Sequence, residues 1–545
     1  MTISHPHRCL VSIAIPALAV MLTILFGNPL FATNDDTGLA MIGAGFGMAA
    51  KPEPHLVFSH YGYGLLLKGL SSIVGARAHG FATLFAVGFS LGLFTYVVGK
   101  RVDLLVVSLL IAGGFFYAAA FLEPQFTITA SALVASGLAC YMASVRRGEI
   151  SPSISACIYF AVILGLLIRP TSAIAVMLVT APAFAWIAIS GAKSERRSMS
   201  VFAGSLATII VLAYGIDWAA YYFSRDWQDV LQYNLVRALF NDFQRVPWDS
   251  EAPAYKTAGW SHNDYLMFFF WFSNHQIYSL QNISLIASEM ATQVPTISLQ
   301  QLAHWFKSLA TTPHTLAILL CQLGITIVFR ESRKINLLLF VGVGLALMIP
   351  ALAGRPPHPR ILLAITSTSL ICSLSLASAS SRTKPVALQY IVAFSAVIAS
   401  LGIGLIFIRQ HGEAVLAASA YRHGLRSATP YLKGKTIAWG DALVWEWLVT
   451  PTEVFHPVED TTIPAVGALS RSPIMSVALN RIGINDLSRS LCTERDISVI
   501  ANEGFIQYLT VFCEQHYQAR PQYKLVHRQA PRTEIYTNRI TEDLR

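Results

Sequence analysis

Residues 9–32 read CLVSIAIPALAVMLTILFGNPLFA, and the polar stretch Thr33-Asn34-Asp35-Asp36-Thr37 follows them directly. At 1.5 Å per residue, the apolar run is long enough to cross about 30 Å of hydrocarbon as one helix. Two adjacent carboxylates at the mouth of a membrane helix are costly to hold near lipid, so they need solvent, a partner or a function. We interpret this polar stretch as part of an active site.

The composition of the chain indicates a polytopic membrane protein. Its 545 residues are 54% hydrophobic and 13% charged, and the mean hydropathy is +0.52. A soluble globular protein does not tolerate such a composition on its surface. The net charge is +9, but most lysines and arginines fall in short clusters beside apolar runs, where they orient helices in the bilayer. We therefore expect membrane lipid as a partner and no nucleic acid.

The apolar runs and their basic flanks predict about eleven transmembrane helices in a bacterial inner membrane, with the N-terminus cytoplasmic and the C-terminus periplasmic. With this assignment, Lys100-Arg101 and Arg146-Arg147 both fall on the cytoplasmic side. The first run resembles a signal peptide at Leu30-Phe31-Ala32, but it is longer than most such segments, so a retained helix is favoured. The predicted spans are about 9–32, 81–99, 104–121, 126–141, 154–168, 173–189, 201–218, 314–329, 335–350, 361–379 and 386–408.

Residues 56–74 are apolar but contain His60, Lys68 and several glycines, so they predict an interfacial or re-entrant helix. Counting this segment as a span would place both basic pairs outside. The large outer loops are then residues 33–78 and 220–313.

Residues 1–409 are predicted to form the transmembrane domain, and residues 410–545 a soluble periplasmic domain with its own core. The alternating stretches Thr436–Trp439 and Phe505–Leu509 suggest a small mixed α/β unit. Because the periplasm is oxidising, we expect Cys492 and Cys513 to form a disulfide.

The polar residues on the outer side fall into four places, and Asn34-Asp35-Asp36, near His55 and His60 in sequence, is the first. A carboxylate close to low-dielectric surroundings has a raised pKa, and a second carboxylate raises it further, which suits a general base. The alternative is a solvated turn in which Asp35 or Asp36 caps a helix over Thr37–Phe46.

The second and third places are Glu123 and Arg169. Glu123 lies in a short outer loop and is a candidate metal ligand, a candidate acceptor for a sugar hydroxyl, or a solvated carboxylate. Arg169 precedes Pro170 at the outer end of a helix, against the positive-inside tendency. It is a candidate phosphate clamp, or it reaches lipid headgroups without further function.

The fourth place is the outer loop Gly354–Arg360, in which three prolines stiffen a segment that holds Arg355, His358 and Arg360. An anionic ligand such as a lipid phosphate explains these residues, and headgroup binding without specificity is the alternative.

The long loop adds Trp260, His262 and Asp264, which would hold a sugar by stacking and hydrogen bonds or simply pack the loop. The aromatic run Phe268–Phe272 is apolar enough to lie in the membrane interface, and its polar flank would then face the first loop.

Taken together, these features resemble the GT-C glycosyltransferases, which are polytopic enzymes that transfer a sugar from a polyprenyl-phosphate donor. The resemblance covers mainly residues 9–220, with weaker support from Arg355–Arg360 and the soluble C-terminal domain. The motifs that carry it are Asn34-Asp35-Asp36 after the first span, Pro54–Ser59 with Gly62 and Leu65–Leu70, Glu123, and Arg169-Pro170.

The resemblance implies an inverting transfer in which Asp35 or Asp36 removes the proton of an acceptor hydroxyl. Arg355, Arg360 and Arg169 would stabilise the leaving lipid phosphate. It also implies a polyprenyl-phosphate-linked sugar donor and a glycan, lipid or protein acceptor. Whether a divalent cation, Mg or Mn, is required stays open, and Asp36 with Glu123 would hold one. The adjacent Asp-Asp leaves open which residue is the base.

Two other functions compete with this interpretation. A polysaccharide polymerase or ligase of the O-antigen type, which uses undecaprenyl-pyrophosphate glycans, typically relies on loop arginines and histidines and lacks an Asp pair after the first span. A lipid or solute transporter places ionisable groups near the bilayer midplane and often shows two related halves. Here the span interiors are almost uncharged and no internal repeat is evident.

Overall fold

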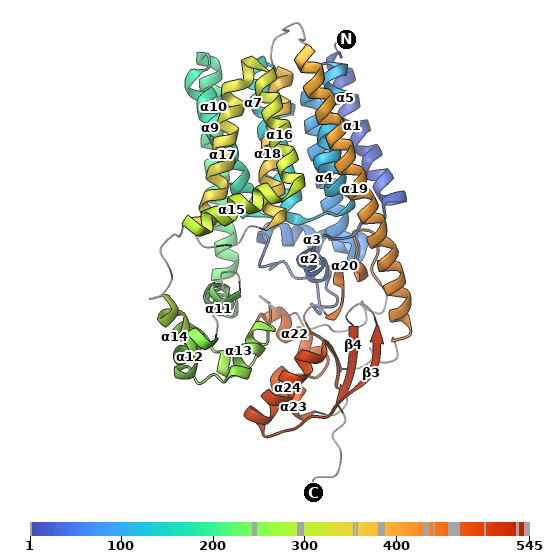
Figure 1. Ribbon diagram of the computed structural model, residues 1–545, viewed down its shortest axis with the longest axis vertical. Coiled ribbons are helices and arrows are strands. Elements are labelled where there is room, and N and C mark those ends of the chain that lie inside the picture. The colour runs from blue at the N-terminus through green and yellow to red at the C-terminus, as the bar shows by residue number, and fades with distance from the viewer. Residues whose placement is uncertain are drawn as a thin grey trace.

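The computed structural model consists of a bundle of long helices and a smaller unit beyond one end of it (Figure 1). The described residues are 3–241, 248–291, 299–352, 355, 358–379, 387–428, 435–439, 442–455, 469–494, 497–529 and 533–538. Within them the chain is mainly helical, with one small sheet in the C-terminal region. The predicted fold class, a polytopic helical protein with a small α/β unit, is confirmed.

Each predicted span corresponds to an apolar helix of the bundle. In the described part of the chain, nine helical stretches are long and apolar enough to cross a membrane, or ten if a bent pair around Pro313 counts as one. The prediction of about eleven is higher because it also counts α8, which has only 17 residues. The helices are α1 (His5–Leu22), α4 (Ala78–Val98), α5 (Val102–Ala112), α6 (Ala118–Leu122), α7 (Phe126–Arg147), α8 (Pro152–Ile168), α9 (Pro170–Ser190), α10 (Lys193–Tyr222), α16 (Pro313–Val328), α17 (Arg333–Leu352), α18 (Pro359–Ala379) and α19 (Ala387–Arg426), with π-helical turns at Thr23–Gly27 and Gly113–Tyr117.

Helix α7 is the centre of the bundle, because α4, α8, α9 and α18 pack around it and nearly all of its residues are buried. Small residues at the contacts of α7 with its neighbours allow the helices to approach closely. A Cβ atom on Gly165 of α8 would lie 2.6 Å from Val134 and 2.9 Å from the carbonyl of Ala130. Only glycine fits there, as at other close helix contacts in membranes.

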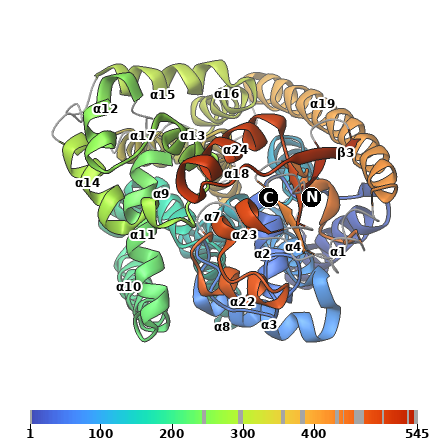
Figure 2. The same ribbon diagram turned by 90° about the horizontal axis from the view of Figure 1, so that it is seen from below.

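The first outer loop contains two helices, α2 (Asn34–Ala44) and α3 (Tyr61–Val74). α3 buries Tyr63 and Leu67 while Leu65 is 49% exposed, and it lies across the end of the bundle (Figure 2). Residues 61–98 are helical throughout and count as one apolar stretch by length. However, a 3₁₀ turn over Gly75–Arg77, in which Gly75 has φ +63°, separates α3 from α4. α3 is thus a separate helix from α4, and its position in the membrane interface stays a prediction.

The long loop is also helical. Its last helix, α15, meets α16 at an angle of 87° and lies across the end of the bundle (Figure 1). The break has a local cause, because Pro313 starts α16 and the preceding Thr312 is held in an extended conformation. The loop helices are α11 (Arg225–Asn241), α12 (Trp248–Thr257), α13 (His262–Phe269), α14 (Leu280–Ala291) and α15 (Leu299–Thr311), with a 3₁₀ turn at Gln276–Tyr278.

The C-terminal unit is a four-stranded sheet, in the order β1-β2-β4-β3, with helices packed against it. β1 and β2 are parallel, and the other neighbours are antiparallel. The predicted boundary after residue 409 lies within α19, which continues without a break as far as Arg426. The elements are β1 (Lys435–Ala438), α20 (Trp445–Leu448), α22 (Pro473–Arg481), α23 (Leu487–Thr493), β2 (Ile497–Ala501), α24 (Glu503–Tyr517), β3 (Tyr523–Gln529) and β4 (Thr533–Asn538).

The two stretches that suggested the α/β unit form different structures. Residues 435–438 form strand β1, whereas Phe505–Leu509 lies in helix α24. The buried residues of α24 are Phe505, Ile506, Leu509, Phe512 and Cys513. That spacing is the helical period of about 3.6 residues, which the short window 505–509 could not distinguish from alternation.

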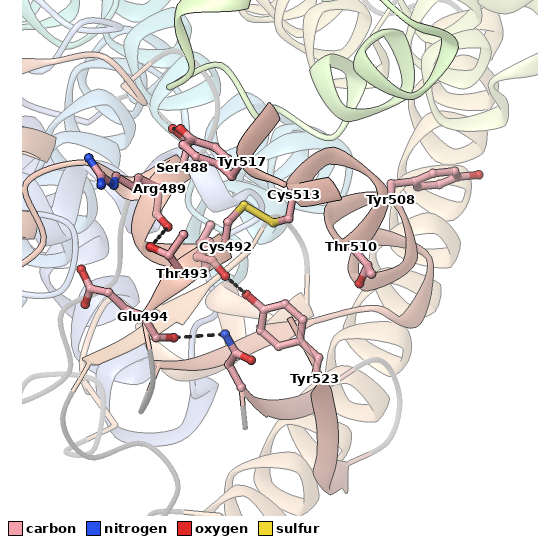
Figure 3. The surroundings of a disulfide bond; sticks show 12 residues. Ser488, Arg489, Cys492, Thr493, Glu494, Tyr508, Thr510, Cys513, Tyr517 and Tyr523 are labelled. Carbon is pink, nitrogen blue, oxygen red and sulfur yellow. Dashed lines mark hydrogen bonds between the residues drawn. A yellow bond between two sulfur atoms is a disulfide. The ribbon is translucent and has the colours of Figure 1, made fainter. Parts of the chain in front are cut away.

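The predicted disulfide between Cys492 and Cys513 is confirmed, and it joins α23 to α24 (Figure 3). The Tyr523 hydroxyl of β3 donates to the Leu491 carbonyl, 2.5 Å away, beside this bond. The bond and its surroundings therefore connect both helices to the sheet.

Candidate active site

Asp35 and Asp36 lie in the first turn of α2, but their surroundings differ. Asp36 is fully buried. Its Oδ1 accepts the backbone N–H of Phe126 at 2.8 Å, and its Oδ2 accepts the Thr33 hydroxyl at 2.7 Å. The bond to Phe126 attaches the start of α2 to the start of α7. Each carboxylate oxygen of Asp36 thus accepts a hydrogen bond from the protein itself.

A histidine that the sequence analysis missed completes the surroundings of Asp36. His79, at the start of α4, places Nε2 3.4 Å from Asp36 Oδ1, and its Nδ1 lies 3.0 Å from the Tyr63 hydroxyl. Both ring and carboxylate are buried. The chain Tyr63–His79–Asp36 joins α3, α4 and α2, and such a fully partnered buried network stiffens the loop that carries Asp35.

Asp35 faces the arginines of the fourth predicted place. Its Oδ2 lies 3.2 Å from Arg360 Nη1, and the two side chains are 29% and 32% exposed. Burial raises the pKa of the Asp35 carboxyl above its usual range. Arg360 opposes this effect, Asp36 adds to it, and Arg169 again opposes it. Asp35 is therefore an accessible carboxylate with raised basicity beside a cation.

Arg169 lies between these elements, at the junction of α8 and α9. Its guanidinium donates to the carbonyl of Phe58 and lies 4.9 Å from the ring centroid of Phe126. The carbonyl of Phe58 is presented by a γ-turn, since Val57 has φ +63° and Phe58 N–H donates to the carbonyl of Leu56 at 2.7 Å. A β-branched residue rarely adopts this conformation, so the turn holds local strain beside the site.

The loop before α18 places Arg355 and His358 at the same end of the bundle. The Arg355 carbonyl accepts Trp305 Nε1 of α15 at 2.8 Å, and Arg355 acts electrostatically on Arg169. The carbonyl of His358 accepts the first amides of α18, and its side chain is exposed. Arg360 and Arg169 thus act on Asp35, and Arg355 extends this cationic group on the side of Arg169.

Glu123 has a different neighbour from the one expected. Its Oε1 lies 3.3 Å from Nδ1 of His411 on α19, whose Nε2 lies 3.0 Å from the Gly27 carbonyl. The proposed metal pair, Asp36 and Glu123, is thus occupied by other partners. Within the described ranges, no three His, Cys, Asp or Glu side chains gather closely enough to hold a metal ion. We derive no step through an ion.

His55 and His60 are held by α10 and the start of α11. The His55 ring stacks on Trp227 at 4.9 Å, and its Nδ1 pairs with Glu53. The buried His60 caps α3 by accepting the Gly62 N–H at 2.8 Å, while its Nε2 lies 2.7 Å from the Ala213 carbonyl. Both rings fasten the first loop to its surroundings, and the structure does not place them with Asp35.

The three residues proposed in the long loop lie away from Asp35, around α13. Trp260 is buried and donates Nε1 to the carbonyl of Ile277 at 3.0 Å. Asp264 accepts from Ser261 N–H at 2.8 Å and from His516 Nε2 of α24 at 2.8 Å. His262 is exposed and contacts Trp248. Trp260 therefore packs within the long loop, and Asp264 joins this loop to the C-terminal unit.

The expected membrane location of the aromatic run Phe268–Phe272 is wrong. Phe268 and Phe272 are buried, and the Phe272 ring packs 4.8 Å from Phe512 and 5.3 Å from Trp439 of the C-terminal unit. The Trp439 indole also donates to the carbonyl of Phe270 at 2.7 Å. The run is apolar because it forms a core between two parts of the protein, which composition alone could not distinguish from a lipid contact.

A carboxylate from the C-terminal unit also reaches the site. α20 packs against α2, and Asp36 and Asp35 both act electrostatically on the carboxylate of Glu446. The sequence holds one weak signal for it, a single charge within the apolar stretch Val444–Leu448. Nothing in the sequence indicated that this stretch would meet α2.

Comparisons with known proteins give structural neighbours only, since no protein-family model and no curated protein matches the chain. One neighbour is the structure of ArnT from Cupriavidus metallidurans in the apo state. Its sequence is 11% identical to this chain, and the TM-score is 0.39 over 97% of each chain. For the structure of the same protein bound to undecaprenyl phosphate, the sequence identity is 10% and the TM-score is 0.37. The oligosaccharyltransferase AglB from Archaeoglobus fulgidus, in complex with an inhibitory peptide and a dolichol-phosphate, is 12% identical, with a TM-score of 0.42 over 98% of this chain and 75% of that one.

Proposed function

We propose that this protein is an inverting membrane glycosyltransferase of the GT-C type, which moves a sugar from a polyprenyl-phosphate donor to a hydroxyl of a glycan, lipid or protein acceptor. One observation carries the proposal: Asp35 is partly exposed and pairs with Arg360 inside a group of three arginines. A base and a phosphate-binding group are thereby side by side, as a sugar transfer from a lipid phosphate requires.

In the proposed reaction, Asp35 accepts the proton of the acceptor hydroxyl as that oxygen attacks the anomeric carbon. The bond from the anomeric carbon to the phosphate oxygen breaks, and the lipid phosphate leaves with the electron pair. Arg360, with Arg169 and Arg355, stabilises the charge that develops on the phosphate. Attack from the face opposite the phosphate inverts the anomeric configuration.

The contact between Asp35 and Arg360 has a role in this sequence of events. When a donor phosphate binds, it offers Arg360 a second anionic partner with suitable geometry for a guanidinium. Arg360 then turns partly to the phosphate, and Asp35 loses part of the interaction that lowers its pKa. Donor binding therefore increases the basicity of Asp35.

The proposal places Asp35 on the periplasmic side of an inner membrane. Arg8 and Lys100 both pair with Glu149, and the Lys100 carbonyl accepts the backbone N–H of Ile3. These residues lie near the N-terminus, at the end of the bundle opposite the C-terminal unit (Figure 1). Basic groups at that end fit the cytoplasmic side. A disulfide in the C-terminal unit fits an oxidising compartment.

The test is a transfer assay with purified protein in lipid vesicles. Synthetic polyprenyl-phosphate sugars serve as donors, and the acceptors are membranes from cells that lack the gene. We expect release of polyprenyl phosphate and a product of inverted anomeric configuration, measured by NMR. Chelation before the assay tests whether transfer requires Mg or Mn. Use of undecaprenyl-pyrophosphate glycans, with no transfer from any phosphate-linked sugar, would overturn the proposal in favour of a polymerase or ligase.

A further inference from the structure

Residues 55–61 of the first outer loop are bound along one face of α10. Four groups of α10 meet four groups of this segment, at positions that recur every three or four residues of the helix. Such positions share one side of a helix. The contacts are those of the Ala213 carbonyl with His60 Nε2 (2.7 Å), Asp217 Oδ1 with the Tyr61 N–H (2.7 Å), the Ala220 carbonyl with His55 Nε2 (3.3 Å), and the Tyr221 hydroxyl with the Val57 N–H (3.0 Å).

The other sides of this part of α10 are open. Ile216, Trp218 and Tyr222 are exposed, and α10 lies at the edge of the bundle (Figure 2). Contact with lipid accounts for exposed apolar residues on a membrane helix. It does not account for Asp217, because a carboxylate in such a helix needs a polar partner. The polar face of α10 therefore serves the first outer loop.

On its other side, the same segment is bound to the junction of α8 and α9. The His60 N–H donates to the Leu167 carbonyl at 3.0 Å, and the Phe58 carbonyl accepts the Arg169 guanidinium. Residues 55–61 thus lie between α10 and the arginine that faces the proposed donor phosphate.

The turn at Val57 connects these two sets of contacts. Val57 has φ +63°, a conformation that is costly for a β-branched residue and persists where neighbouring contacts enforce it. The Tyr221 hydroxyl accepts the N–H of this very residue, and the preceding Leu56 is fully buried. The turn places Phe58, and the bond from His60 to Leu167 holds the chain beyond it. The Phe58 carbonyl is therefore held between two fixed points.

We infer that Tyr221 is a positioning residue for the donor-binding group of the proposed transfer. Its hydroxyl holds the strained turn at Val57, and the turn offers the Phe58 carbonyl to Arg169. The inference rests on the proposed function, in which Arg169 stabilises the charge on the leaving phosphate. A guanidinium needs a fixed orientation to bind a phosphate through parallel hydrogen bonds. Tyr221 therefore acts on donor use from a helix that does not carry Arg169.

Tyr221 also packs as an aromatic ring, with its centroid 5.0 Å from that of His55 and 5.4 Å from that of Trp227. Tyr221→Phe keeps this ring and removes the hydroxyl alone, so it separates packing from the bond to Val57. The matched control is Tyr222→Phe on the next residue. Tyr222 is exposed, and its ring stacks on Trp218 at 4.3 Å.

The experiment measures both variants in the vesicle transfer assay with the synthetic polyprenyl-phosphate sugar. We expect Tyr221→Phe to lower kcat/KM for this donor about tenfold and to leave the KM for the acceptor unchanged. The loss is smaller than for removal of an arginine, because Arg169 keeps its charge. Tyr222→Phe keeps both parameters within about twofold of the parent. Thermal unfolding of each variant separates loss of fold from loss of donor use.

A rescue variant decides whether Tyr221 acts through the turn. Glycine adopts positive φ without strain. The double variant Tyr221→Phe/Val57→Gly should therefore recover kcat/KM for the donor to within about threefold of the parent. A second double variant decides whether the effect passes through Arg169. In the Arg169→Ala background, adding Tyr221→Phe should lower kcat/KM no further.

Three results overturn the inference. They are a parental kcat/KM in Tyr221→Phe, no recovery with Val57→Gly, and a full tenfold loss on adding Tyr221→Phe to Arg169→Ala. In each case the parental protein still transfers sugar, so the proposed function stands. If the parent itself transfers no sugar from the donor, the proposed function fails and the inference fails with it.

Discussion

Two helices on the same side of the protein, α2 and α13, carry aspartates in their first turns. Asp35 of α2 and Asp264 of α13 differ in exposure and in hydrogen-bond partners. Asp264 of α13 is buried and bonded to Ser261 and His516. Asp35 of α2 is partly exposed and faces Arg360. A first-turn carboxylate is therefore not a functional signal in itself, and its role depends on which distant residues meet it.

Asp35→Asn should have the largest effect and separates the two acids most clearly. Loss of the general base lowers kcat by about 100-fold to 10,000-fold, because the acceptor proton then has no receiver. Asp264→Asn, the matched change in α13, should keep kcat within about twofold. The vesicle transfer assay measures both, and equal losses in the two variants would remove the distinction between the helices.

Arg360→Ala should have the next largest effect. It removes a donor to the phosphate, and we expect kcat/KM for the lipid-linked sugar to fall about 100-fold. Arg360→Lys should recover only part of the loss, since an ammonium cannot bind a phosphate through two parallel bonds. An unchanged kcat/KM for Arg360→Ala would show that the partner of Asp35 is not a substrate-binding group.

Asp264→Asn should instead reduce stability. It weakens the capping box with Ser261 and the contact with His516, so the free energy of unfolding should fall by about 1–3 kcal/mol. Thermal unfolding in detergent measures the change. His516→Gln, which removes the other side of the same contact, is the parallel variant and should show a loss of similar size.

The pH dependence of transfer is the smallest effect and concerns Asp35 alone. The base works only when deprotonated, so kcat falls as the pH drops through its pKa. Burial raises that pKa, so the acid limb should lie at higher pH than for an ordinary carboxyl. In Arg360→Ala the limb should move higher still, because the cation that lowers the pKa is gone. A shift to lower pH would contradict the assignment of Asp35.

The sequence predicted which residues share one end of the bundle more reliably than it predicted their contacts. Counting apolar runs and basic flanks placed Asp35 and Arg360, 325 residues apart, on one face, and the structure brings them into contact. The choice between Asp35 and Asp36 was out of reach, because both occupy the first turn of α2. We propose Asp35 because Asp36 is bound by the Phe126 amide and by His79, at separations of 90 and 43 residues.

The predictions that failed share a cause. The aromatic run Phe268–Phe272 and the stretch Phe505–Leu509 are both apolar, and each was interpreted from its local pattern. In the structure they face each other, with Phe270 and Phe272 about 6 Å from Phe505. An apolar pattern records that a residue is buried, but the partner that buries it, whether lipid, sheet or another helix, is a property of the whole fold.

The unbroken course of α19 has a consequence for how the two parts of the protein work together. This helix passes from the bundle to the C-terminal unit, where Tyr421 and Leu425 are buried. Packing in both parts of the protein therefore fixes the rotation of α19 about its own axis. One residue inserted between His411 and Tyr421 would turn the C-terminal unit by about 100°. The contact between α20 and α2 thus depends on the number of residues in a membrane helix.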